Sequence, residues 1–223
     1  MLEFALRDDL DKRAPRAMCV LNPLKVTITN WDAGKQLMLT IPSHPKDESL
    51  GVREIPFTRE LYIDQTDFME NPPKDFKRLV PGEEVRLRGA YVIRCDEVIK
   101  DASGNVIELK CSHDENTLGK NPEGRKVKGV IHWVPAQESV PVQVRLYDRL
   151  FNNESPDSGD KNFLDYINPN ALVVLDNARA EPSLAKATSA IAFQFEREGY
   201  FVKDDVDSTG GKLVFNRTIM LRD

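Results

Sequence analysis

Cationic side chains gather in one stretch of the chain, Lys77 to Arg94, which reads KRLVPGEEVRLRGAYVIR. The stretch contains five cations and two anions, a local charge of +3, whereas the whole chain has a formal net charge of -5. A basic patch on an acidic protein allows selective contact with a polyanion, because phosphates are attracted to the patch and not to the rest of the surface. The alternative interpretation is an exposed edge strand whose charges prevent aggregation.

Strand geometry brings two of these cations together. If residues 82–99 form one continuous strand, Arg86 and Arg88 project from the same face, about 7 Å apart. That separation matches adjacent phosphates or bases of a single strand, and guanidinium groups suit both. The basic segments 77–78 and 125–128 extend the patch. His132-Trp133 is a candidate stacking platform for bases, although a tryptophan in an apolar strand is more typical of a core.

Three polar side chains outside this stretch are further candidates for contact with a polyanion. Arg16 stands alone in the segment APRAM, where an arginine usually caps a helix or forms an ion pair. Gln194 and Arg197 are three positions apart, so a regular strand would place them on opposite faces. A bulge or the end of the strand must lie between them if they act together.

Catalytic and metal-binding patterns are scarce. The sequence has no nucleophile elbow, no zinc-protease motif and no phosphate-binding loop, so we expect no catalytic residue. Cys111 and His113 are the one closely spaced Cys/His pair, and two ligands are too few for a structural zinc site. We therefore expect no metal and no cofactor in this chain. Three widely spaced cysteines predict a reducing, cytoplasmic compartment.

Short β segments separated by turn signals must position these residues. Alternating or β-branched runs predict strands at 20–28, 54–63, 82–99, 104–112, 125–134, 140–151, 171–176, 192–205 and 212–221. Residues 3–12 and 182–190 are the expected short helices. The fold class is therefore mainly β, a barrel or a sandwich, with the segment 152–161 as the best linker. We find no apolar run of membrane-spanning length and no secretory signal.

Seven segments in collinear order resemble the C-terminal anticodon-binding region of bacterial glutaminyl-tRNA synthetases. They are APRAMCVLNP (14–23), KRLVPGEEVRLRGAYVI (77–93), GRKVKGVIHWV (124–134), VRLYDRLF (144–151), AEPSL (180–184), AFQFEREGYF (192–201) and VFNRTIMLRD (214–223). The resemblance covers essentially the whole chain, which makes it far more specific than any single motif.

The resemblance implies two small β-barrels with short helical connections. Residues 1–13 would end a preceding helical segment. A proximal barrel would combine residues 14–63 with 165–223, and a distal barrel would contain residues 64–164 with the linker. The HIGH-like and KMSKS-like signatures of the family are missing from the sequence. We therefore expect a fragment that binds tRNA without activating glutamine by itself.

The family's base-reading residues fall on matching positions of this sequence. The resemblance implies that Arg16, Gln194 and Arg197 surround the middle anticodon uracil, and that Arg78 reads the third-position guanine. Arg86 and Arg88 match the residues around the first base. Lys77 matches a basic residue that supports the same loop. Asp75 and Lys46 depart from the family pattern, which puts peripheral contacts at these two positions in doubt.

The expected partners are the glutamine anticodon loop of tRNA and the catalytic domain of the same polypeptide, with no DNA and no membrane. We expect a monomer. The resemblance implies ATP with magnesium for the full-length ligase only. Two alternatives stay open. One is the anticodon-binding domain of an archaeal or eukaryotic-type glutamyl-tRNA synthetase, and the other is a β-barrel interaction module whose basic patch meets an acidic protein.

Overall fold

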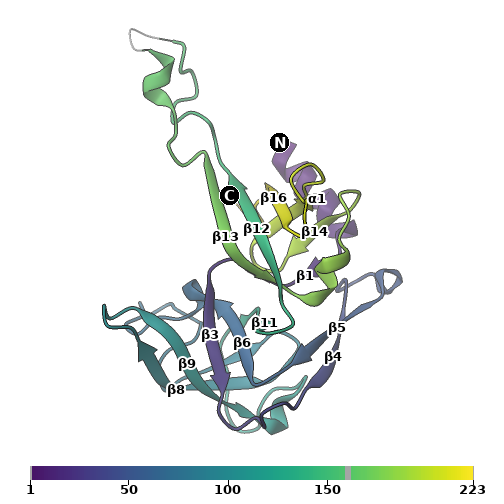
Figure 1. Ribbon diagram of the computed structural model, residues 1–223, viewed down its shortest axis with the longest axis vertical. Helices are drawn as coiled ribbons and strands as arrows, with labels where there is room; N and C mark the ends of the chain where they lie inside the picture. The colour runs from purple at the N-terminus through teal and green to yellow at the C-terminus, as the bar shows by residue number, and fades with distance from the viewer. Residues whose placement is uncertain (1, 159–161, 223) are drawn as a thin grey trace.

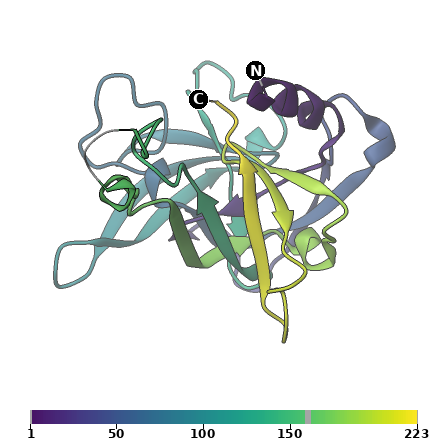
Figure 2. The same cartoon turned by 90° about the horizontal axis from the view of Figure 1, so that it is seen from above.

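The computed structural model describes residues 2–158 and 162–222, which fold mainly into two curved β-sheets (Figure 1). The chain begins with helix α1 (Leu2–Arg13), whose Leu10 packs with Tyr200 and Ile219 of the second sheet. Figure 2 shows the same arrangement from above, with α1 beside the C-terminal end of the chain. Among the described residues, no helix has the length and apolar character that crossing a membrane requires.

The first sheet nearly closes into a barrel. Its strands, in hydrogen-bonded order, are β10 (Val130–Ile131), β7 (Glu84–Leu87), β8 (Val92–Lys100), β9 (Val106–Asp114), β3 (Pro23–Ile28), β6 (Glu60–Asp64) and β11 (Val134–Pro135). The two edge strands, β10 and β11, are separated in sequence by His132 and Trp133 alone. These two residues therefore lie at the seam of the barrel.

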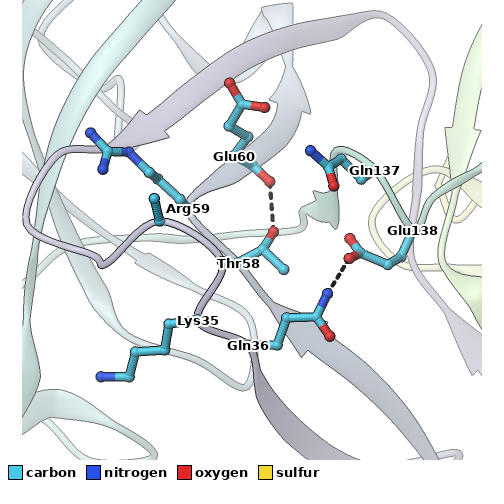
Figure 3. A pocket seen from close by; sticks show the side chains of 9 residues that line it. Lys35, Gln36, Thr58, Arg59, Glu60, Gln137 and Glu138 are labelled. Atoms are coloured by element: carbon cyan, nitrogen blue, oxygen red, sulfur yellow. Dashed lines mark hydrogen bonds between the residues drawn. The ribbon is translucent and has the colours of Figure 1, made fainter.

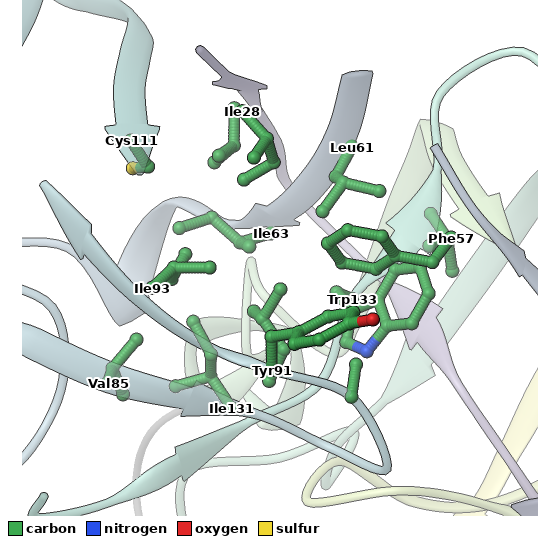
Figure 4. Close-up of a cluster of buried hydrophobic side chains, with 14 of the residues drawn as sticks. Ile28, Phe57, Leu61, Ile63, Val85, Tyr91, Ile93, Cys111, Ile131 and Trp133 are labelled. Carbon is green, nitrogen blue, oxygen red and sulfur yellow. The ribbon is translucent and has the colours of Figure 1, made fainter. Parts of the chain in front are cut away.

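Apolar side chains from alternate strand positions fill this barrel (Figure 4). Leu24, Val26 and Ile28 of β3 point inward, as the alternating burial of that strand shows. Trp133 is fully buried, and its indole N–H donates to the carbonyl oxygen of Arg88 over 2.9 Å. The expectation that this tryptophan belongs to the core, and not to a stacking platform, is therefore confirmed.

The second sheet forms a half-barrel above the first. Its strands, in order, are β1 (Arg16–Ala17), β14 (Ala192–Phe195), β15 (Gly199–Lys203), β16 (Leu213–Ile219), β12 (Val140–Tyr147), β13 (Leu172–Ala180) and β2 (Cys19–Val20). The core contains Phe195, Phe201 and Phe215, and the first two rings stack with their centroids 4.3 Å apart. The described residues between β12 and β13, 148–158 and 162–171, project away from both bodies (Figure 1).

A two-stranded ribbon and, among the described residues, five short 3₁₀ helices complete the fold. The ribbon pairs β4 (Leu37–Pro42) with β5 (Val52–Phe57). The 3₁₀ helices are η1 (Glu48–Leu50), η2 (Gln65–Asp67), η3 (Glu115–Thr117), η4 (Phe163–Tyr166) and η5 (Pro182–Lys186). The side chains of Asp47, Asp64, Asp114 and Asn162 cap η1 to η4 by accepting a backbone N–H, as such residues do at helix starts.

The mainly β fold class is confirmed, and two local expectations need correction. The strand expected over 82–99 is broken by a turn at 88–91, where Gly89 has a φ of 66° that favours glycine. The second helix is the 3₁₀ helix η5 and ends at Lys186. β3 pairs with β6 and β9 in the first sheet, and β12 pairs with β16 in the second.

Candidate functional site

A buried carboxylate, that of Asp67, lies where the two sheets meet. Asp67 is the last residue of η2, which follows β6 in the first sheet. Its two oxygens accept hydrogen bonds from the Nη1 and Nη2 atoms of Arg197 over 2.6 and 2.7 Å. Its Oδ1 atom also lies 3.3 Å from Nε of Arg78. The structure therefore brings two of the predicted site residues to one anion.

The 3₁₀ turn η2 holds this carboxylate in place. The Asp64 side chain accepts hydrogen bonds from the backbone N–H of Thr66 and of Asn22, each over 3.0 Å. Leu79 donates its backbone N–H to the carbonyl oxygen of Asp67 over 3.0 Å. Arg78 in turn donates from Nη1 to the carbonyl oxygen of Thr66 over 2.8 Å. The segments 64–67 and 78–79 are thus linked by several bonds.

Arg197 reaches Asp67 from the hairpin that joins β14 to β15. Its φ of 73° makes it the one non-glycine residue with positive φ among the described residues. An L-residue in this region carries about 1–3 kcal/mol of strain, which the surroundings must offset. Since β14 ends at Phe195, the end of the strand lies between Gln194 and Arg197, which is one of the two arrangements expected from their spacing.

Two titratable side chains lie beside Arg197. His132 is buried at the seam of the barrel, and burial lowers the pKa of its imidazole. Its Nδ1 atom lies 3.4 Å from Nη1 of Arg197, and its Nε2 atom is buried without a hydrogen-bond partner among the described residues. Nε2 lies 3.9 Å from Oε1 of Glu198. Burial, with the charges of Asp64 and Asp67, raises the pKa of Glu198 to about 7.

A row of ion pairs runs from Arg88 into the second sheet. Nε of Arg88 lies 2.7 Å from Glu196, and the other oxygen of Glu196 accepts from Arg53 over 2.9 Å. Arg53 also lies 2.8 Å from Glu181, whose carboxyl pKa is raised by burial. Removing one member would leave a buried charge unpaired, so this row fixes the position of Arg88 relative to the second sheet.

Arg86 has a different environment from Arg88. Its Nη1 atom donates to the carbonyl oxygens of Thr117 and Ala90 over 2.9 and 3.2 Å, and Nη2 donates to the carbonyl oxygen of Lys120. Arg86 and Arg88 therefore bind separate partners, and their projection from one face stays a prediction. β7 ends at Leu87, so Arg88 lies in the turn and points to Glu196.

Arg16 and Gln194 occupy opposite positions in the parallel pairing of β1 with β14. The Arg16 guanidinium donates to the carbonyl oxygen of Ala14 over 2.8 Å and pairs with Asp11, which ties β1 to the end of α1. Gln194 has a buried Oε1 atom without a hydrogen-bond partner among the described residues. Parallel partners project to the same face of a sheet, so this acceptor and Arg16 share one face.

Lys77 is exposed on the loop that precedes Arg78. The loop packs directly on the backbone of Gly129. A Cβ atom added at Gly129 would lie only 1.8 Å from the carbonyl oxygen of Lys77. Gly129 also has a φ of 86°, which glycine adopts readily. Any larger residue at position 129 would push the loop of Lys77 and Arg78 away. Gly129 therefore keeps this loop in contact with the start of β10.

The three arginines at the sheet junction combine fixed anchors with solvent access. The side chains of Arg78, Arg88 and Arg197 are 40%, 47% and 24% exposed, and each pairs with a carboxylate. A guanidinium has five N–H donors, so an anchored group keeps others for a ligand. Fixed guanidinium donors are suited to the edges of bases and to phosphate oxygens.

Sequence reasoning missed the anions of this site and considered His132 only as part of a stacking platform. No pattern in the sequence identifies the arginine partners of Asp67, Glu196, Glu198 and His132. The one sequence signal was the pair Asp64 and Asp67 directly after a β run, because the first aspartate of such a pair often caps a helical turn. Which carboxylate meets which arginine depends on contacts between residues 130 positions apart.

A separate pocket of about 250 Å³ lies between residues 33–36, 58–60 and 137–138. Figure 3 shows Gln36 donating to Glu138 across its mouth, and Thr58 donating to the carbonyl oxygen of Glu60 over 2.8 Å. None of the predicted site residues lines this pocket. The candidate site at the junction of the sheets is therefore separate from this pocket.

Two family models and several curated proteins match this chain. The family described as "tRNA synthetases class I (E and Q), anti-codon binding domain" matches at residues 14–114 and, through a second model with the same description, at residues 130–204. The chain is similar to proteins named glutamine–tRNA ligase from Ectopseudomonas mendocina (66% identical over 225 residues), Pseudomonas putida (64%) and Azotobacter vinelandii (62%).

Each of these alignments covers 100% of this chain and 40% of the relative. The chain therefore spans about two fifths of the length of the curated relatives that it matches. The two matched regions together contain all seven predicted site residues. On these matches, the chain belongs to the anticodon-binding domain family of the class I tRNA synthetases (E and Q).

Proposed function

We propose that this chain binds the anticodon loop of glutamine tRNA through Arg78, Arg88 and Arg197 at the junction of the two sheets. The observation that carries the proposal is the ion pairing of Arg197 and Arg78 with one buried carboxylate, Asp67, within a chain of this family. Single-stranded loops suit such a surface, because their bases can unstack and expose Watson–Crick edges to fixed donors.

The middle base is assigned to Arg16, Gln194 and Arg197, as the resemblance implies. The unpartnered Oε1 atom of Gln194 supports this assignment. A buried acceptor without a hydrogen bond destabilises the protein, and a bound ligand that donates to it removes this cost. The N3–H group of a uracil would supply such a donor. Arg16 shares the face of Gln194 and, through its contacts with Ala14 and Asp11, also holds β1 in place.

The third base is assigned to Arg78, and the first to the region of Arg86 and Arg88. Arg88 is exposed and anchored by Glu196, which supports a direct contact. Arg86 is committed to three backbone carbonyl groups, so its proposed role is to hold the loop 117–121 against β7. Lys77 is exposed beside Arg78, which suits a contact with the phosphate backbone.

The remainder of a full-length polypeptide would supply the chemistry. The relatives are named glutamine–tRNA ligase and are much longer than this chain, which supports a catalytic domain elsewhere in the polypeptide. ATP use and magnesium belong to that domain in this proposal, because the sequence of this chain has no phosphate-binding motif. Recognition of the anticodon here would be coupled to aminoacylation there, in a monomeric cytoplasmic enzyme.

The projecting segment between β12 and β13 is the surface that we propose for contact with the catalytic domain. Large apolar side chains are exposed in it at Leu150, Phe163 and Leu164, and at Leu172 and Val173 where β13 begins. Patches of this kind often mark interaction sites. Hydrogen exchange should be slower in this segment of a full-length protein than in this chain alone, and equal exchange rates would contradict the contact.

One titration separates the proposed function from its alternatives. The chain is titrated with stem-loops that contain the glutamine anticodon, a glutamate anticodon or an unrelated anticodon, at two salt concentrations. We expect the glutamine loop to bind most tightly and the difference between loops to persist at the higher salt, because base contacts are screened less than phosphate contacts. Preference for the glutamate loop would favour the glutamyl enzyme, and equal binding of all loops would favour the interaction module.

A further inference from the structure

One carboxylate contacts two of the arginines that we assign to different bases. The Asp67 side chain is 1% exposed, accepts two hydrogen bonds from Arg197, and lies 3.3 Å from Nε of Arg78. The two arginines reach it from separate elements, the hairpin between β14 and β15 and the loop before Leu79. Two cations therefore share one anion at a position that water hardly reaches.

Asp67 has little freedom to move away from either arginine. Its peptide is fixed by the bond from Leu79, and its 3₁₀ turn is capped by Asp64. Arg197 is fixed as well, because its hairpin position has a left-handed φ and its Nη1 atom also approaches His132. A rigid anion thus determines the orientation of both guanidinium planes before any ligand is present.

We propose that Asp67 is a positioning residue shared by Arg78 and Arg197, and that it couples recognition of the second and third anticodon bases. The proposal rests on the proposed function, because it takes the two arginines as base readers. Asp67 itself does not contact RNA in this account. It fixes two donor groups at once, so both base contacts depend on the same anchor.

The shared anchor has a specific energetic consequence. When one arginine is removed, the buried carboxylate of Asp67 keeps only one cationic partner. The remaining guanidinium is then drawn closer to the carboxylate. The remaining arginine then changes its orientation toward its own base. Groups that share a partner in this way show non-additive effects on substitution, whereas independent groups show additive effects.

The test measures the dissociation constant of the whole chain for three stem-loops: the glutamine anticodon, a loop altered at the middle base, and a loop altered at the third base. Four proteins form the cycle: the parent, Arg78→Gln, Arg197→Gln and the double variant. For each variant, the effect is the ratio of its dissociation constant to that of the parent. We expect the effect of the double variant to differ from the product of the two single effects by about threefold or more, in line with coupling between contacting residues.

Asp67→Asn provides the direct test of the anchor. This variant should weaken binding of the glutamine loop by about tenfold and reduce discrimination at both the middle and the third base, since each guanidinium loses its fixed orientation. In the Asp67→Asn background, the Arg78→Gln and Arg197→Gln effects should become additive. A merely structural defect would weaken all three loops by the same factor and leave discrimination intact.

The matched control is Asp207→Asn, which removes a carboxylate paired with Arg145 over 2.6 Å in the second sheet, outside the junction. This control should leave all three dissociation constants unchanged. If Asp67→Asn fails to fold, which loss of thermal cooperativity would reveal, the cycle of Arg78 and Arg197 in the parent background still decides the matter.

The outcomes separate the two proposals. Additive effects of Arg78→Gln and Arg197→Gln in the parent, or an equal loss on all loops for Asp67→Asn, would overturn the shared role while leaving the anticodon function intact. No effect of either arginine substitution on any loop would overturn the proposed function itself, and the shared role with it.

Discussion

Two regions of this chain hold arginines in different ways. At the junction of the sheets, Arg78, Arg88 and Arg197 are paired with carboxylates and remain partly exposed. On β7, Arg86 is surrounded by backbone carbonyl groups of residues 90, 117 and 120. In the sequence, Arg78, Arg86 and Arg88 belong to the same basic stretch, whereas Arg197 stands between two glutamates. The difference teaches that the partner of a guanidinium, and not its place in a basic run, indicates whether it is available to a ligand.

The largest effect is expected for Arg197→Ala at the junction. Binding of the glutamine stem-loop should weaken by about 1–3 kcal/mol, because a fixed pair of donors to the middle base is lost. Binding of a loop altered at the middle base should weaken much less. Equal losses on both loops, in parallel titrations, would show that this arginine contacts only the RNA backbone.

Arg86→Ala should act on folding more than on recognition. Loss of a guanidinium that satisfies several carbonyl groups is expected to lower the free energy of unfolding by about 2 kcal/mol. Denaturant unfolding measures this change, and hydrogen exchange should be faster at residues 117–121. Binding of all stem-loops should weaken by one common factor. Loss of selectivity for the first base in this variant would instead place Arg86 among the base readers.

Glu198→Gln tests the electrostatics of the junction through pH. The pKa of Glu198 is about 7 in the folded protein, against an ordinary value of 4.5. Between these values the folded state keeps a proton that the unfolded chain releases, so this group lowers stability as pH rises from 4.5 to 7. The neighbouring charged groups are His132, Asp64, Asp67, Arg78 and Arg197.

The glutamine variant cannot titrate and should be more stable than the parent above pH 7, by about 1 kcal/mol for a partly exposed group. This advantage should shrink as the pH falls toward 4.5. Unfolding free energies measured at pH 5 and pH 8 check the prediction. A constant difference between the two proteins at both pH values would mean that Glu198 is ionised throughout.

The smallest effect is expected for Arg94→Ala. Arg94 is exposed and pairs with Asp96 two positions away on the same strand. Exposed ion pairs contribute little, so stability and stem-loop affinity should each change by less than about 0.5 kcal/mol. The variant is also a charge-matched control for the others. A large loss of affinity would extend the candidate surface onto β8.

The sequence predicted the β content, the first helix and most strand positions, because alternating apolar residues and turn signals act locally. It placed Trp133 correctly in the core for the same reason. The turn at Arg88 was missed, although Gly89 lies in it, because the flanking residues continue a β pattern. The pairing of Asp67 with Arg197 was beyond reach, since it depends on how two sheets pack and not on any local pattern.

The measurement that tests the central difference between the two regions compares Arg78→Ala with Arg86→Ala. Each protein is titrated with the glutamine stem-loop and with a loop altered at the third base. Arg78→Ala should lose most of its preference for the glutamine loop, whereas Arg86→Ala should keep its preference while binding both loops more weakly. Retained preference in Arg78→Ala, or lost preference in Arg86→Ala, would contradict the account of anchored readers at the junction and a structural arginine on β7.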